Sequence, residues 1–192
     1  MARTAAPGSR ERILRTAGDL FYRHGIRAVG MNQVIDAAGC GKNLLYTHFP
    51  SKNDLVAAYL RACRAVRDRE SAAATAGLAD DPAARLRALI AEIAASAARP
   101  DFRGCAFRMY LTEFPDDAGE PARMARDYLH DTRAEIDDLI VRLDVADPGQ
   151  LADRIWLIVE GLYATAARPD SAAASAAATR LVDDLLAGAA PR

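Results

Sequence analysis

The sequence lacks the residue groupings that metal sites and most helical enzymes require. Its three cysteines are odd in number and form no Cys-x-x-Cys pair, which argues against a disulfide framework or a zinc site. His24, His48 and His130 are scattered, no Glu-x-x-His pair exists, and no glycine-rich phosphate loop occurs. These absences argue against an enzyme, and we expect no metal and no cofactor.

Long apolar stretches are also missing. No hydrophobic run approaches the length of a membrane span, and residues 1–10 lack the apolar core of a signal peptide. Reduced thiols and the absence of a membrane segment favour a soluble protein in the cytoplasm. Residues 1–8 are expected to form a short, flexible, basic arm.

Aromatic residues are scarce, at 6% of the chain, and the Val/Ile/Thr alternation typical of strands is rare. Alanine is abundant, and together with leucine, arginine and glutamate it makes a helix-forming composition. Hydrophobic residues make up 51% of the 192 residues and charged residues 27%, enough for a folded core and a solvated surface. The composition predicts an all-α fold.

Lysine is nearly absent: only two of the 25 basic residues are lysines, Lys42 and Lys52. Both lie in the N-terminal 55 residues, which carry eight basic and four acidic side chains, a net charge of +4. The remaining chain has a net charge of −5, although the whole protein has only −1. We call residues 1–55 the basic head and residues 56–192 the acidic body. This division of charge favours binding of the head to a polyanion, although many enzymes divide their charge in a similar way.

Three short helices are predicted in the basic head. Ser9 can cap the first, Gly25 follows its end, and Gly39 separates the second from the third. Two short helices joined through a glycine turn are typical of a helix-turn-helix. The predicted ranges are Ser9–His24, Met31–Ala38 and Gly41–Phe49.

Six further helices are predicted in the acidic body, from capping signals and prolines. Pro50 ends the third helix, and Ser51 with Asp54 resembles a capping box that opens the fourth. Asp81 and Asp147 each precede a proline, the arrangement of an N-cap followed by proline at N1. The predicted ranges are Ser51–Ala74, Pro82–Ala98, Phe102–Phe114, Pro121–Leu143, Pro148–Ala167 and one opened by Pro169-Asp170-Ser171 that ends near Gly188.

A dense pattern in the head points to a known family. Between Arg12 and Leu60 the order and spacing of the pattern residues resemble the DNA-binding domain of the tetracycline-repressor (TetR) family without interruption. The matching pieces are Ile13, Ala17, Leu20-Phe21, Gly25, Ala38-Gly39, Leu45-Tyr46, His48-Phe49, Ser51-Lys52 and Leu55. The resemblance implies residues 9–54 as a helix-turn-helix domain and residues 55–192 as a helical ligand-binding and dimerisation domain.

The resemblance also implies the DNA-contacting residues. In a helix-turn-helix the second helix enters the major groove, where an Asn such as Asn43 can read adenine and a Leu such as Leu44 can touch a thymine methyl. Tyr46 and Lys52 match phosphate-contacting positions of the family. The candidates are Asn32, Gln33, Lys42, Asn43, Leu44, Tyr46, Thr47, His48 and Lys52.

Some residues depart from the family pattern. Gly30 and Gly41 replace the hydroxyl residues that usually cap the second and third helices, which removes two groups available to phosphate. Ile35 stands where a small alanine is usual, and Cys40 where a valine is usual. Cys40 is interpreted as a small core residue, with a redox sensor as the alternative.

The body is assigned its roles mainly by the resemblance. A segment with Gly104-Cys105 and Glu113-Phe114-Pro115 is similar to one in a subgroup of the family, and cavity walls need apolar residues with a few polar groups. The ligand-binding candidates are Cys63, Phe107, Tyr110, Glu113, Tyr128, Trp156 and Tyr163. The dimer candidates, on the last two helices, are Leu151, Ile155, Ile158, Leu162, Leu181 and Leu185, with packing inside one chain as the alternative.

The sequence therefore predicts a ligand-responsive transcriptional regulator, most simply a repressor. It would bind a palindromic DNA operator as a homodimer and be released by a small molecule. The alternatives are a helical enzyme, whose residue groupings are missing, and an architectural DNA-binding protein without ligand. The large acidic body argues against the second alternative.

Overall fold

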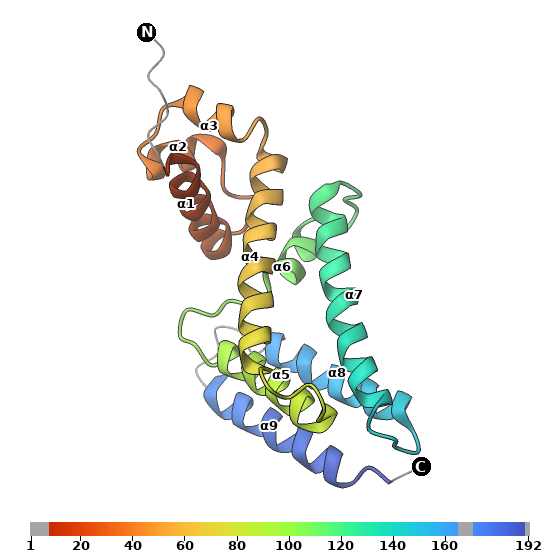
Figure 1. Ribbon diagram of the computed structural model, residues 1–192. Coiled ribbons are helices and arrows are strands. Elements are labelled where there is room, and N and C mark those ends of the chain that lie inside the picture. The colour runs from red at the N-terminus through yellow and green to blue at the C-terminus, as the bar shows by residue number, and fades with distance from the viewer. Residues whose placement is uncertain (1–7, 165–170, 191–192) are drawn as a thin grey trace. The chain divides into compact units, whose positions relative to one another are not determined.

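The computed structural model describes residues 8–164 and 171–190, and within them the chain forms nine α-helices (Figure 1). This confirms the all-α prediction. The helices are α1 (Ser9–His24), α2 (Met31–Ala38), α3 (Lys42–His48), α4 (Lys52–Ala74), α5 (Pro82–Ala97), α6 (Ala106–Glu113), α7 (Glu120–Val141), α8 (Pro148–Ala164) and α9 (Ser171–Ala187).

Two compact units make up the described chain. Unit 1 contains the residues up to Ala65 together with Ala106–Asp127, and unit 2 contains Val66–Cys105 and the residues from Tyr128 onward. Helices α4 and α7 therefore each contribute to both units. Unit 1 extends beyond the predicted DNA-binding segment 9–54, because α6 and the start of α7 belong to it.

The core of unit 1 is built by one apolar face from each of α1 to α4. On α1 the residues at i, i+4 and i+8 are buried, as the helical period requires. Phe21 meets Tyr59 of α4 edge to face, with 5.7 Å between the ring centroids. The buried side chains of these helices include Ile13, Ala17, Phe21, Val34, Ala38, Leu45, Phe49, Leu55 and Tyr59.

Two glycines shape the helix-turn-helix. Gly39 ends α2 with φ 57° and ψ 43°, a left-handed conformation in which Cβ-bearing residues are strained, and this confirms the predicted break. Gly25 follows α1 with φ 85° but ψ 149°, so the chain leaves that helix in an extended direction instead of the expected left-handed cap.

Ser9 is not the cap of the first helix, contrary to the sequence prediction. It lies inside α1, Gly8 occupies the cap position, and no side chain caps this end. The Ser9 hydroxyl, in a residue only 2% exposed, bonds instead to Nε2 of His48, at 3.0 Å. A partner 39 positions away in sequence has replaced the local one.

The other helix-start predictions can be compared directly. Asp81 accepts a hydrogen bond from the Ala84 amide at 2.9 Å, and Asp147 one from Gln150 at 2.9 Å, so both N-caps are confirmed. The Ser51 hydroxyl accepts the Asp54 amide at 3.1 Å and donates to the Asp54 carboxylate at 2.6 Å. This confirms a capped start for α4, although a full capping box would bring the acid to the Ser51 backbone.

Helix α6 begins at Ala106, four residues later than predicted. Gly104 adopts φ 117°, which no helix tolerates, so residues 102–105 lead into the helix without regular secondary structure. The predicted extensions of α8 through Ala167 and of the ninth helix to Pro169 lie outside the described residues.

The core of unit 2 is formed by α5, α8 and α9 together with the later part of α7. Helices α5 and α9 lie side by side (Figure 1), with α8 against both. Leu86, Ile140, Ile155 and Val159 are at most 1% exposed there. Among the described residues no helix is both long and apolar enough to cross a membrane.

Candidate functional site

Helix α3 presents a polar face to solvent. Leu45 in the helix and Phe49 directly after it are 0% and 1% exposed and anchor the helix in unit 1. The opposite side is exposed at Lys42, Asn43, Tyr46 and Thr47, so the helical period separates anchoring residues from available ones. An exposed helix with a cation, an amide and hydroxyls suits the edges and phosphates of a DNA groove.

Leu44 and His48, two further predicted contacts, are half-buried. His48 accepts or donates a hydrogen bond with the Ser9 hydroxyl, and Arg10 lies over the neighbouring Phe49 ring, 5.1 Å from its centroid. These contacts tie the start of α1 to the end of α3. His48 therefore has a structural partner within the chain in addition to its predicted DNA role.

On α2 the predicted contact residues Asn32 and Gln33 are both exposed, at the start of the helix. Lys52, at the start of α4, is half-buried and donates through Nζ to the carbonyl oxygen of Arg27 at 3.4 Å. Burial lowers the pKa of the Lys52 ammonium, and the Glu113 carboxylate opposes this shift. Lys52 is thus held beside the loop that joins α1 to α2.

Glu113 contacts that same loop. Its carboxylate accepts hydrogen bonds from the backbone amides of Ile26, at 3.0 Å, and Arg27, at 2.7 Å. The Arg27 guanidinium donates to the Glu113 carbonyl oxygen and lies over the Phe114 ring, 5.0 Å from its centroid. The carboxylate of Glu113, one of the predicted ligand-binding residues, is thus bonded to the backbone of the loop between α1 and α2.

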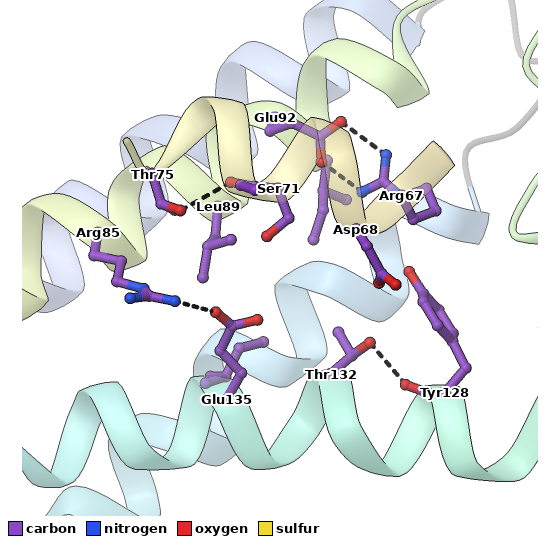
Figure 2. Close-up of a pocket in the computed structure, with 13 residues that line it drawn as sticks. Arg67, Asp68, Ser71, Thr75, Arg85, Leu89, Glu92, Tyr128, Thr132 and Glu135 are labelled. Carbon is purple, nitrogen blue, oxygen red and sulfur yellow. Dashed lines mark hydrogen bonds and ion pairs between the residues drawn. The ribbon is translucent and has the colours of Figure 1, made fainter. Parts of the chain in front are cut away.

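A cavity of about 280 Å³ lies within unit 2, between α4, α5 and α7 (Figure 2). Its wall combines apolar side chains with hydroxyl groups and charged groups. The lining residues are Arg67, Asp68, Ser71, Ala72, Thr75, Arg85, Leu89, Glu92, Ile93, Tyr128, Thr132, Glu135 and Ile136.

Two ion pairs belong to this wall (Figure 2). Arg67 of α4 binds Glu92 of α5 through both terminal nitrogens, at 2.7 and 2.5 Å, and Arg85 of α5 binds Glu135 of α7 at 2.8 Å. Burial lowers the pKa of Arg67, but the Glu92 bond outweighs it and leaves that pKa raised. Burial also raises the pKa of the Tyr128 phenol, although the nearby Arg67 guanidinium opposes the shift.

Arg85 has one group that the protein does not satisfy. Its Nε is buried and makes no hydrogen bond within the described part of the chain. A buried donor without an acceptor costs on the order of 1–3 kcal/mol, so an acceptor oxygen reaching this atom would be favourable.

Of the seven predicted ligand residues, only Tyr128 lines this cavity. Tyr110 donates to the Asp117 carboxylate at 2.6 Å, and Phe107 is 2% exposed. Trp156 and Tyr163 pack against the unit 2 core, where Tyr163 stacks on Phe102 at 6.3 Å. Cys63 is half-buried and lies outside the lining.

The sequence carries a signal for this wall in its polar residues, of which only Tyr128 is among the predicted ligand-binding residues. Polar residues recur at helical spacing on three helices, at positions 67, 71 and 75, at 85 and 92, and at 128, 132 and 135. Polar residues at this spacing lie on one face of each helix, and on helices of a buried core they indicate a polar internal surface.

The predicted dimer residues are placed mainly inside the chain. Leu151, Ile155 and Leu162 are 6%, 0% and 2% exposed and pack in the unit 2 core. Ile158 and Leu185 are half-buried against that core. Leu181 is 51% exposed, and Leu157, which is not among the predicted dimer residues, is 70% exposed.

Other chemistry finds little support. Across residues 8–164 and 171–190 no group of three or more His, Cys, Asp and Glu residues is arranged to hold a metal ion. Burial raises the pKa of the Cys40 thiol, although Arg12 opposes the shift, which disfavours the reactive thiolate.

Known proteins resemble this chain over the helix-turn-helix. The family model of bacterial regulatory proteins of the tetR family matches residues 13–59. The uncharacterised HTH-type transcriptional regulator YxaF of Bacillus subtilis is 41% identical over 54 residues, 28% of either chain. The regulator LmrA of the same organism is 33% identical over 87 residues, which are 44% of this chain and 45% of LmrA. These matches span less than half of either relative.

Solved structures match nearly the whole chain. A TetR-family transcriptional regulator of Streptomyces coelicolor superimposes with a TM-score of 0.86 and 27% identity, over 94% of this chain and 95% of its own. A TetR-type transcriptional regulator of Streptomyces avermitilis is 30% identical, with a TM-score of 0.68 over 94% of this chain and 97% of its own. The helix-turn-helix, the full-length likeness and the regulatory character of these relatives agree, and the chain belongs to the TetR family of transcriptional regulators, a family of regulators and not of enzymes.

Proposed function

We propose that the protein is a cytoplasmic, homodimeric repressor that binds a palindromic DNA operator and leaves it when a small molecule binds. The observation that carries the proposal is the exposed polar face of α3 above its buried anchors. Asn32 and Gln33 on α2 and Lys52 on α4 supply further polar and cationic groups in the same unit. Reading two half-sites requires two heads, which a homodimer provides.

DNA binding is tested with the protein's own upstream DNA in a gel-shift titration at several salt concentrations. The expected result is a specific complex that competitor DNA does not displace and whose affinity falls steeply with salt, because phosphate contacts release counterions. Equal binding to upstream and unrelated DNA would overturn the operator in favour of an architectural protein.

Repression is tested by fusing that upstream DNA to a reporter gene. The expected result is a lower signal when the protein is expressed and recovery of the signal when the effector is added. One relative over the head, FasR of Mycolicibacterium smegmatis, is named a transcriptional activator, at 40% identity over 52 residues. A signal that rises with expression of the present protein would replace repression by activation.

We assign the effector to the cavity of unit 2. A volume of about 280 Å³ falls just below the usual range of roughly 300–1,000 Å³ for ligand sites, so the effector is expected to be small. Leu89, Ile93 and Ile136 offer an apolar wall, and the Arg85 side chain, which also lines the cavity, offers a cationic hydrogen-bond donor. These groups suit a compact molecule with an apolar part and a hydrogen-bond-accepting oxygen.

Arg85→Met is the variant that tests this assignment, with Arg87→Met as its matched control. Arg87 lies two positions along the same helix and also pairs with a carboxylate, Asp183 at 2.8 Å, but on the surface. Small molecules are screened for those that raise the thermal stability of the wild type. Hits should lose their effect in Arg85→Met and keep it in Arg87→Met. Equal retention in both would place the effector elsewhere.

A further inference from the structure

Glu113 ends α6, where a carboxylate is locally unfavourable. The C-terminus of a helix carries partial negative charge, and α6 has no basic residue in its last turn to balance the acid. Helix stability therefore does not explain this residue. Its hydrogen bonds lie with a segment 86 and 87 positions earlier in the chain.

The partners of Glu113 are backbone amides of the α1–α2 loop, residues 25–30. A carboxylate that accepts two amides, at 3.0 and 2.7 Å, makes charge-assisted bonds that are stronger than neutral ones. The Arg27 side chain returns to α6, bonding the Glu113 carbonyl and covering the Phe114 ring. Loop and helix are thus joined in both directions.

The remaining side of the loop is occupied by Lys52. Its ammonium donates to the Arg27 carbonyl at 3.4 Å, so the same peptide segment is bonded by Glu113 through its amide and by Lys52 through its carbonyl. Gly25 permits the close approach: it adopts φ 85°, and a Cβ there would lie 3.2 Å from a Glu113 carboxylate oxygen.

We propose that Glu113 is a positioning residue for DNA binding, which holds the α1–α2 loop and, through Arg27, the DNA-contacting ammonium of Lys52. The proposal rests on the DNA-binding function proposed above. Glu113 itself touches no DNA. It fixes the end of α1 and the approach to α2 so that Lys52 meets a phosphate without first being ordered.

The first test uses no DNA. In Glu113→Gln the amide group has one acceptor oxygen in place of two, and it brings a donor toward the loop amides. Hydrogen exchange at the Ile26 and Arg27 amides should therefore quicken roughly tenfold or more, as expected for the loss of a bond to a charged group. Glu120→Gln is the control, because Glu120 is an exposed acid of the same unit that pairs with Arg61. Unchanged exchange in Glu113→Gln would overturn the proposal.

The second test measures operator affinity and its salt dependence, well below the unfolding temperature of each variant. Glu113→Gln should weaken binding roughly three- to tenfold, equally for operator variants, and lower the salt slope toward that of Lys52→Ala. The loss should be smaller when Lys52 is already Ala, because the two residues act through one loop. Glu120→Gln should match the wild type.

The outcomes separate the two proposals. If the wild type binds its operator and Glu113→Gln binds with the same affinity and slope, the positioning role is overturned and the proposed function stands. If the two substitutions weaken binding by independent factors, the link through Lys52 is overturned. A wild type that binds no DNA specifically overturns the proposed function, and the DNA-positioning role with it.

Discussion

At the scale of single residues, the two lysines differ in how firmly the protein holds them. Lys42 is exposed at the start of α3, whereas Lys52 is half-buried and bonded to the Arg27 carbonyl. A long side chain that is already ordered loses less entropy when it meets a phosphate. Lys52 is therefore suited to a fixed phosphate contact, and Lys42 to an adaptable one.

Lys52→Ala should weaken binding to all DNA sequences by a similar factor, because phosphate contacts carry no base information. The slope of log affinity against log salt should become shallower by about one unit. The measurement is a salt series of binding isotherms for operator and unrelated DNA. Arg99→Ala, an exposed cation of unit 2 with only long contacts to carboxylates, should leave the slope unchanged.

Asn43→Ala should act differently, because an amide can read the donor and acceptor of adenine. We expect the base preference at one position of each half-site to relax, at a cost of about 1–3 kcal/mol for the preferred operator. Sequencing of sites selected from random DNA measures this. Asn53→Ala, an exposed amide in the first turn of α4, should leave the selected motif intact. The same motif for Asn43→Ala and the wild type would remove Asn43 from base reading.

At the scale of helices, the sequence predicted the starts and ends correctly where the contacts that determine them are local. The caps at Asp81 and Asp147 and the break at Gly39 depend on residues within four positions, and the structure confirms them. The Ser9 prediction was wrong because the hydroxyl found His48 instead. Local propensity could not reveal a partner so distant in the sequence.

The candidate sites follow the same division. The exposed face of α3 could be predicted from helical period and family pattern, because burial of Leu45 and Phe49 decides the rest of that helix. The contact of Glu113 with the α1–α2 loop could not be predicted, since its partners are backbone amides of another segment. Because every residue except proline has the same backbone amide, the sequence does not indicate which amides a carboxylate will bind.

Helix α3 offers a stability prediction. Its cap position, Gly41, has extended backbone angles, φ −76° and ψ 149°, makes no side-chain bond, and has open space where a Cβ would stand. Gly41→Ser should stabilise the protein by a few tenths of a kcal/mol, because a hydroxyl can accept a free amide of the first turn, whereas Gly41→Ala should destabilise it. Urea unfolding measures both. Equal stability of the two variants would show that the cap hydroxyl finds no amide.

At the scale of the whole molecule, the proposed homodimer needs a surface on the acidic body through which two subunits pair. The exposed faces of α8 and α9 carry Leu157 and Leu181, each with a small residue one helical turn away, the exposed Gly161 on α8 and the half-buried Ala177 on α9. Small residues permit close approach, and large apolar ones fill the gaps between helices. Since a two-fold axis repeats the same patch on both subunits, one such surface is sufficient for a dimer.

Leu157→Glu should therefore yield a folded monomer. In a dimer that pairs α8 and α9 of both subunits, the two new carboxylates would be buried near the two-fold axis, at a high cost in desolvation. Light scattering gives the mass, and circular dichroism confirms that the helices remain.

Ile155→Glu, two positions earlier but 0% exposed, should instead unfold unit 2, because the charge would enter its core. The monomer should bind an isolated half-site weakly and lose the preference for paired half-sites, because only a dimer can contact both at once. A Leu157→Glu protein that remains dimeric would place the interface on another surface.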